Sequence, residues 1–111
     1  MEITDKDKVK TYETTMPLLL AMFGEFKELS KKTPTSAISK QKITIVNRLL
    51  NKILEALENE DTKNYLDLLD EDDIPQLSDV ALILSQYVAA MQAFKQKYHG
   101  WDGNNHRWFT K

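Results

Sequence analysis

The sequence predicts an all-α protein: an antiparallel bundle of three long helices, one or two short helices, and an aromatic C-terminal tail. Only 3 glycines and 3 prolines interrupt its 111 residues, and the turn-rich, alternating pattern of a sheet protein is missing. Apolar residues recur instead at spacings of three and four, which places them on one face of a helix. Because no internal repeat is visible, we expect one domain over residues 1–111 rather than a solenoid.

The first long helix is expected over residues 15–32. Pro17 fits its first turn, because proline lacks the N–H that would be unpaired there. Gly24 interrupts the apolar pattern and predicts a close approach by a neighbouring helix. Residues 1–14 are mostly polar and predict a flexible arm or a short helix. The apolar stripe of the long helix comprises Leu18, Leu19, Met22, Phe23, Phe26 and Leu29.

The second helix has the clearest pattern of the three and should begin at Ser36 or Ser39 and end near Glu58. Either serine can accept a hydrogen bond from a free N–H of the first turn. Its apolar stripe is wider than that of the first helix, which predicts a central position in the bundle. The stripe comprises Ile43, Val46, Leu49, Leu50, Ile53, Leu54 and Leu57.

A third long helix is expected to begin at Ser78 and Asp79 and to end near Tyr98. Gly100 would terminate it in the left-handed conformation that favours glycine. A short helix capped by Asp61 should precede it. The links are short enough to predict that sequential helices are antiparallel neighbours.

Composition excludes several classes of protein. The absence of cysteine excludes disulfides, thiolate zinc sites and cysteine nucleophiles, and it fits a reducing compartment. The N-terminus is charged where a signal peptide would be apolar, and no apolar run approaches the roughly 20 residues that span a membrane. We therefore expect a cytoplasmic protein without a membrane partner.

Charge is distributed unevenly along the chain. Residues 55–79 hold ten acidic residues and a single lysine, although the net charge of the chain is only −2. This segment is either a solvated loop or a rim that attracts a basic protein partner. A calcium loop is not expected, because Pro75 stands where the EF-hand pattern requires glycine. The densest part, the acidic cluster, comprises Asp70, Glu71, Asp72 and Asp73.

A basic link joins the first two predicted helices. A helix N-terminus carries positive partial charge, so lysines near it suggest a nearby anion. The alternatives are ordinary surface lysines, an acidic protein partner, and nucleic acid. A pI near 5.7 counts against a dedicated nucleic-acid binder. The candidate anion-binding residues are Lys31, Lys32, Lys40 and Lys42.

The C-terminal tail, residues 99–111, concentrates two tryptophans, a phenylalanine and two histidines. Such a tail either packs over the end of the bundle or docks on a second chain. No fixed helical face brings His99 and His106 together, so we expect no metal site.

We expect a non-catalytic protein without a cofactor, because the chain offers no recognisable nucleophile, base and orienting group. Its apolar faces exceed what a small bundle hides, which predicts protein–protein interaction as a homodimer or complex subunit. The alternative is an accessory factor that binds nucleic acid through residues 31–42. The expected partner anchors are Tyr87, Met91, Trp101, Trp108 and Phe109, with the acidic cluster as an electrostatic rim.

Overall fold

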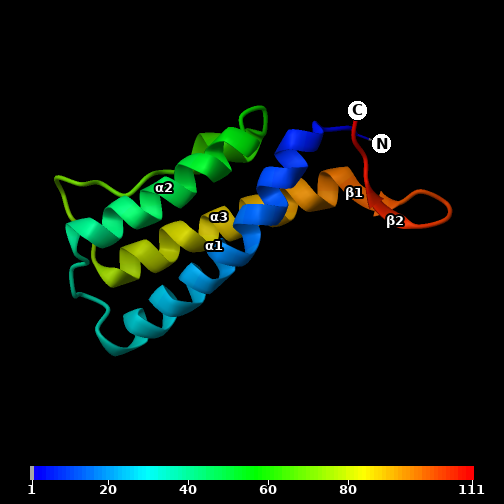
Figure 1. Ribbon diagram of the computed structural model, residues 1–111. Helices are drawn as coiled ribbons and strands as arrows, with labels where there is room; N and C mark the ends of the chain where they lie inside the picture. The colour runs from blue at the N-terminus through cyan, green and yellow to red at the C-terminus, as the bar shows by residue number, and fades with distance from the viewer. Residues whose placement is uncertain (1) are drawn as a thin grey trace.

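Three long helices form the body of the protein, which the computed structural model describes over residues 2–111 (Figure 1). The body is elongated, with principal extents of 49 × 24 × 20 Å. The predicted helical character is confirmed, whereas a short two-stranded hairpin at the C-terminus was not predicted. The elements are α1 (Lys6–Lys32), α2 (Lys40–Ala56), the 3-10 helix η1 (Asp61–Tyr65), α3 (Leu77–Tyr98), β1 (His99–Trp101) and β2 (His106–Trp108).

Helix α1 begins nine residues earlier than predicted and carries Pro17 in its interior rather than in its first turn. An interior proline removes a backbone hydrogen bond and costs about 3 kcal/mol. The helix continues upstream because Tyr12 is buried there, with its ring 5.8 Å from Phe94 and 5.1 Å from Trp108. The expected arm of residues 1–14 is therefore helical from Lys6 onward, and Met1 lies outside the described residues.

Gly24 does not mark a close helix contact. A methyl group built on its Cα would meet no atom within 4 Å, so the position opens to free space. The predicted close approach is wrong here, because the residues that pack α1 against its neighbours lie on another face of the helix.

Helix α2 begins at the second of the two predicted serines. The hydroxyl of Ser39 accepts a hydrogen bond from the N–H of Lys42 at 3.2 Å, which caps the helix. The helix ends at Ala56, two residues before the expected end. Its buried residues are Ile43, Val46, Leu50, Ile53 and Ala56.

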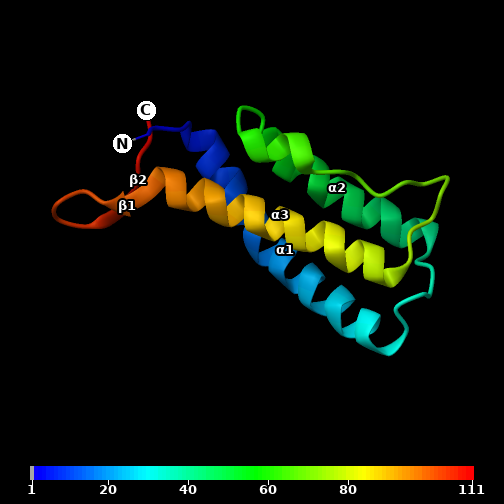
Figure 2. The ribbon, with the colours of Figure 1, turned by 180° about the vertical axis from the view of Figure 1, so that it is seen from behind.

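Helices α2 and α3 run parallel, contrary to the prediction that sequential helices are antiparallel. At one end the N–H of Leu77 donates to the carbonyl of Ser36 at 2.8 Å. At the other end the hydroxyl of Tyr98 donates to Glu60 at 2.8 Å. Residues 57–76, the crossing link, therefore return along the length of the bundle (Figures 1 and 2). Both helices are antiparallel to α1.

The crossing link is held by two side chains, one from each parallel helix. The amide of Asn47 on α2 donates to the carbonyl of Leu69 and accepts from its N–H, both at 2.9 Å. The hydroxyl of Tyr87 on α3 donates to the carbonyl of Asp67 at 2.9 Å. The link is extended around Asp67 and Leu69 and has no neighbouring strand. The side chains of Asn47 and Tyr87 therefore supply the hydrogen-bond partners that a sheet would otherwise provide to its backbone.

Helix α3 starts with a capping box centred on Gln76, two residues before the predicted cap at Ser78. The carboxylate of Asp79 accepts from the N–H of Gln76 at 3.2 Å. The helix ends at Tyr98, as predicted. By length and by its mean hydropathy of 1.3, α3 is apolar enough to cross a membrane. Nine of its residues are buried within the bundle, which accounts for this composition.

The tail forms a hairpin that packs on the end of the bundle. Gly100 lies in β1 and is not left-handed; the one positive φ among residues 2–111 is 105° at Gly103 in the turn. The carboxylate of Asp102 accepts from the N–H groups of Asn104 and Asn105, both at 2.8 Å, which closes this turn. Phe109 and part of Trp108 pack against the bundle, whereas Trp101 stays exposed.

The two ends of the chain meet at this hairpin. The N–H of Thr4 donates to the carbonyl of Phe109 at 3.0 Å, and the N–H of Lys111 donates to the carbonyl of Thr4 at 3.2 Å. Phe109 is consequently buried.

Replacing Gly24 with alanine should raise the free energy of unfolding by about 1 kcal/mol, because alanine favours the helix and the added methyl meets no neighbour. The matched control is Gly103→Ala, which should destabilise the protein because of the positive φ. Urea denaturation of both variants measures the difference. A destabilised Gly24→Ala variant would contradict the open environment.

Replacing Asn47 with alanine should lower the free energy of unfolding by about 1–3 kcal/mol, because two partly buried backbone groups of Leu69 lose their partners. Asn51→Ala, at an exposed position of the same helix, is the control and should change stability little. Equal effects of the two substitutions in thermal or urea unfolding would show that the amide does not hold the link.

Candidate binding groove

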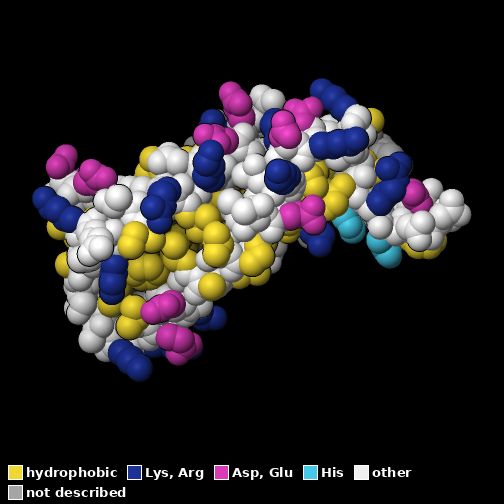
Figure 3. Space-filling model, viewed as in Figure 1, with side chains coloured by type: hydrophobic (Ala, Val, Ile, Leu, Met, Phe, Trp, Pro, Cys, Tyr) yellow, Lys and Arg dark blue, Asp and Glu magenta, His cyan; other side chains and the backbone are white. Residues whose placement is uncertain are grey.

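An open groove of about 870 Å³ runs between α1 and α2. Figure 3 shows it as a continuous hydrophobic surface between the two helices. Phe26 and Val46 lie at its base and are buried, whereas Leu18 and Ile45 are 56% and 43% exposed on opposite walls. Ala21, Met22, Leu29 and Leu49 complete the apolar lining.

The groove exists because α2 has more apolar residues than the core covers. Val46 and Leu50 face the core and are almost completely buried. Ile45 and Leu49 lie beside them on the helix surface and extend the apolar stripe toward α1. Since α1 contributes Leu18 and Met22 to the same space, both helices leave apolar side chains in contact with solvent.

One end of the groove is rich in threonine, but the hydroxyls of this region are largely engaged. Thr15 donates to the carbonyl of Thr11 at 2.7 Å, and Thr11 donates to the carbonyl of Asp7 at 3.0 Å. These bonds lie within α1, so the two hydroxyls are not activated by a neighbouring base. Thr11 and Thr15 therefore contribute to the wall of the groove with their hydroxyl hydrogens already engaged.

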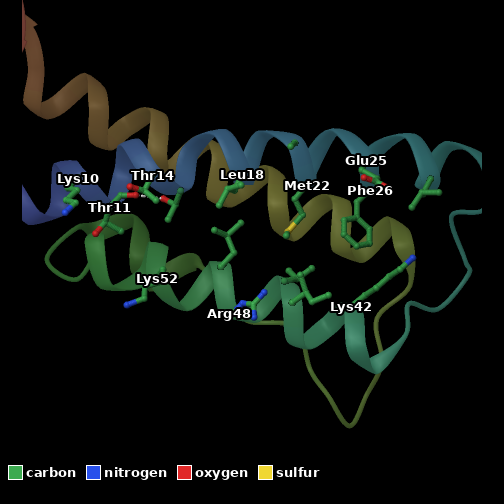
Figure 4. A pocket seen from close by; sticks show the side chains of 16 residues that line it. Lys10, Thr11, Thr14, Leu18, Met22, Glu25, Phe26, Lys42, Arg48 and Lys52 are labelled. Carbon is green, nitrogen blue, oxygen red and sulfur yellow. Dashed lines mark hydrogen bonds between the residues drawn. The ribbon is translucent and has the colours of Figure 1, made fainter.

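Cationic side chains surround the apolar lining. Figure 4 shows Lys10 and Lys52 toward one end and Lys42 toward the other. Glu25 is the one acidic residue among the lining side chains. Lys52 contacts Glu55 at 3.4 Å, but both side chains are about two thirds exposed, so this pair neutralises the rim only weakly. The basic rim comprises Lys10, Lys42, Arg48 and Lys52.

The structure places most of the predicted partner anchors inside the protein. Tyr87 and Met91 are completely buried, Phe109 is 8% exposed, and Trp108 is half-buried. The prediction treated one face of α3 as surplus, but α1, α2 and the crossing link cover this helix from several sides. Tyr87, Met91 and Phe109 cannot contact a partner unless the core opens, whereas Trp108 keeps part of its surface exposed. Trp101, at 58% exposure, is the most accessible of the predicted anchors.

Burial has a chemical effect on Tyr87. Desolvation raises the pKa of its hydroxyl well above the ordinary value, and the nearby Asp67 carboxylate raises it further. Tyr87 therefore stays protonated and acts as a hydrogen-bond donor to the crossing link.

The acidic cluster forms an exposed turn within the crossing link. The carboxylate of Asp70 accepts from the N–H groups of Asp72 and Asp73 at 2.8 and 3.1 Å, which holds its pKa below the ordinary value. None of Asp70, Glu71, Asp72 and Asp73 lines the groove. Across residues 2–111, no group of three or more histidine or acidic side chains is arranged to hold a metal ion.

The structure separates the predicted anion-binding lysines. Lys31 pairs with Glu28 at 3.1 Å on the surface of α1. Lys42 lies at the groove, while Lys32 and Lys40 are exposed outside its lining. Within the described chain, no ion pair shorter than 4 Å joins Lys40 or Lys42 to the acidic cluster.

The hairpin brings the two histidines together, which helical periodicity did not predict. The rings of His99 and His106 are nearly parallel, with centroids 6.4 Å apart, and His99 packs edge-on against Trp108 at 5.1 Å. Burial lowers the pKa of His99, and the charges of Lys95 and His106 lower it further, with Glu13 acting in the opposite direction. The sequence signal for this pairing is the short turn DGNN between the two His-x-Trp triplets.

The groove itself was not predicted from the sequence. The apolar spacing predicts that Leu18 and Leu49 face the core, and the predicted stripes do not include Ile45. The available signal was the width of the α2 stripe, which exceeds the narrow face that one neighbouring helix covers.

No protein-family model, curated protein or solved structure matches this chain. The function must therefore be argued from the groove and its surroundings.

His99 should titrate below the ordinary histidine value of 6.5. Replacing His106 with asparagine should raise the pKa of His99, because a neighbouring positive charge is removed. Since the unfolded chain binds a proton more readily than the folded one, the contribution of His99 to stability is full above pH 6.5 and declines as the pH falls below it. An NMR titration of the imidazole resonances tests this; an unchanged His99 pKa in the variant would exclude coupling of the two rings.

Proposed function

We propose that the protein is a non-catalytic binding module that acts through protein–protein interaction, with the groove between α1 and α2 as its docking surface. The observation that carries the proposal is the pair of half-exposed residues Leu18 and Ile45 on opposite walls of an apolar groove. Contiguous exposed apolar surface with a polar border is characteristic of interaction sites.

The energetics support the same conclusion. Completing the burial of a leucine or isoleucine contributes up to about 1.5–3 kcal/mol, depending on how much of it is already covered. The groove holds several such side chains around a buried base, an arrangement in which a partner side chain can be fully desolvated. The hydroxyls of the lining residues Thr11 and Thr15 donate to backbone carbonyls within α1, which favours binding over catalysis.

The substitution Leu18→Asp should abolish docking, because it places a charge in the apolar lining. The control is Leu82→Asp: Leu82 is 62% exposed on α3 and does not line the groove. The probe is a labelled helical peptide of about 18 residues with a leucine stripe and glutamine flanks. Fluorescence anisotropy should show a loss of at least about tenfold in affinity for Leu18→Asp and little change for Leu82→Asp.

Circular dichroism establishes that both variants are folded before binding is compared. Failure of the unmodified protein to bind the peptide, or equal binding by the two variants, would exclude the groove as the docking surface.

A further inference from the structure

We infer that the partner segment is an amphipathic helix of a different protein, with acidic side chains along the border of its apolar stripe that faces α2. This inference rests on the proposed function and identifies the chemistry of the partner at the same groove.

A helix fits the groove better than an extended strand. The walls are two α-helices, whose backbone groups are already paired within each helix. A strand would therefore find no edge with which to form main-chain hydrogen bonds, whereas a helix brings its own backbone bonds with it. The lining of α1 extends from Lys10 to Leu29, about 28 Å at 1.5 Å per residue, which matches a helix of about five turns.

The basic rim specifies the charge of the partner. Lys42 and Lys52 lie ten positions apart on α2, about 15 Å along the helix, with Arg48 between them. Lys10 adds a cation on the opposite wall, and Glu25 is the one lining acid. Carboxylates on the border of a docked helix that faces α2 would meet three cations, whereas lysines at the same places would be repelled.

The chain covers the face shared by α2 and α3 with a segment that also combines leucines and acidic residues, although this segment is extended rather than helical. The crossing link lies against α2 and α3 through the hydrogen bonds of Asn47 and Tyr87. Leu69 of the link is buried in the core, and acidic residues flank it on both sides as Asp67 and Asp70. The space between α1 and α2 has the apolar lining, but no segment within residues 2–111 covers it.

A second copy of the chain is a poor occupant. Docking two grooves face to face would bring two basic rims together, because a two-fold interface pairs each surface with itself. The acidic cluster of a second copy could supply charge, but its backbone forms a turn fixed by Asp70 rather than a helix. The partner is therefore a different protein.

The test compares three helical peptides of about 18 residues that share one leucine stripe and carry glutamate, glutamine or lysine along one border of it. Fluorescence anisotropy with the full-length protein should rank glutamate above glutamine and glutamine above lysine. We expect a preference of roughly tenfold between successive peptides at about 0.05 M salt, falling toward equality at about 0.5 M salt.

Two sets of variants test whether the basic rim causes the preference for the glutamate peptide. The triple variant Lys42→Gln, Arg48→Gln and Lys52→Gln should lose the preference for glutamate while retaining the glutamine peptide. The matched control Lys31→Gln with Lys32→Gln removes cations outside the groove and should keep the preference.

The outcomes separate this inference from the proposed function. Equal binding of all three peptides, still dependent on Leu18, would overturn the acidic partner and leave the docking groove in place. Absence of any binding would overturn both. An equal loss of preference in the control would assign it to general surface charge and overturn the inference.

Two further results would also overturn it. One is a dimer, measured by light scattering, that Leu18→Asp dissociates, because the occupant would then be a second copy. The other is tighter binding of a single-stranded oligonucleotide than of the glutamate peptide, with that binding lost in the triple variant.

Discussion

The arrangement of the bundle depends on the contacts that hold the crossing link between α2 and α3. Asn47 satisfies both backbone groups of Leu69, and Tyr87 donates to the carbonyl of Asp67. With the link fixed along the bundle, α3 must start beside the start of α2, so the two helices run parallel. The link also covers their shared face. The space between α1 and α2 receives no such cover, and the groove is the consequence (Figures 3 and 4).

A second group of contacts fixes α1 at its N-terminal end. Tyr12 stacks near Phe94 and meets Trp108 edge-on, while Thr4 pairs with the backbone on either side of Thr110. These contacts join the N-terminal and C-terminal segments of the fold and stabilise the part of α1 that precedes Pro17. One wall of the groove is therefore the middle of a long helix whose N-terminal end is anchored, which favours a preformed binding surface over one that assembles on binding.

Charge and apolar surface are combined in the groove in a way that serves solubility and recognition together. The half-exposed Leu18 and Ile45 would favour nonspecific association on a neutral surface. In the docking that we propose, the basic rim around them would disfavour pairing of identical grooves and would select for an acidic border on a partner. The acidic cluster lies elsewhere, in a turn of the crossing link, so the opposite charges of the chain are presented on different surfaces.

The sequence by itself determined the local structure: the three long helices, a serine cap at the start of α2, and the end of α3 at Tyr98 follow from spacing and capping chemistry acting between near neighbours. It did not determine the start of α1 or the direction of α3, because Tyr12 and Asn47 act on residues far along the chain. The hairpin is local, but helical periodicity carries no signal for it. The same limit applies to the site. Apolar periodicity identified the stripe that contains Leu49, but whether such a residue faces a core or solvent depends on which helices stand opposite it, and that is decided by tertiary packing alone.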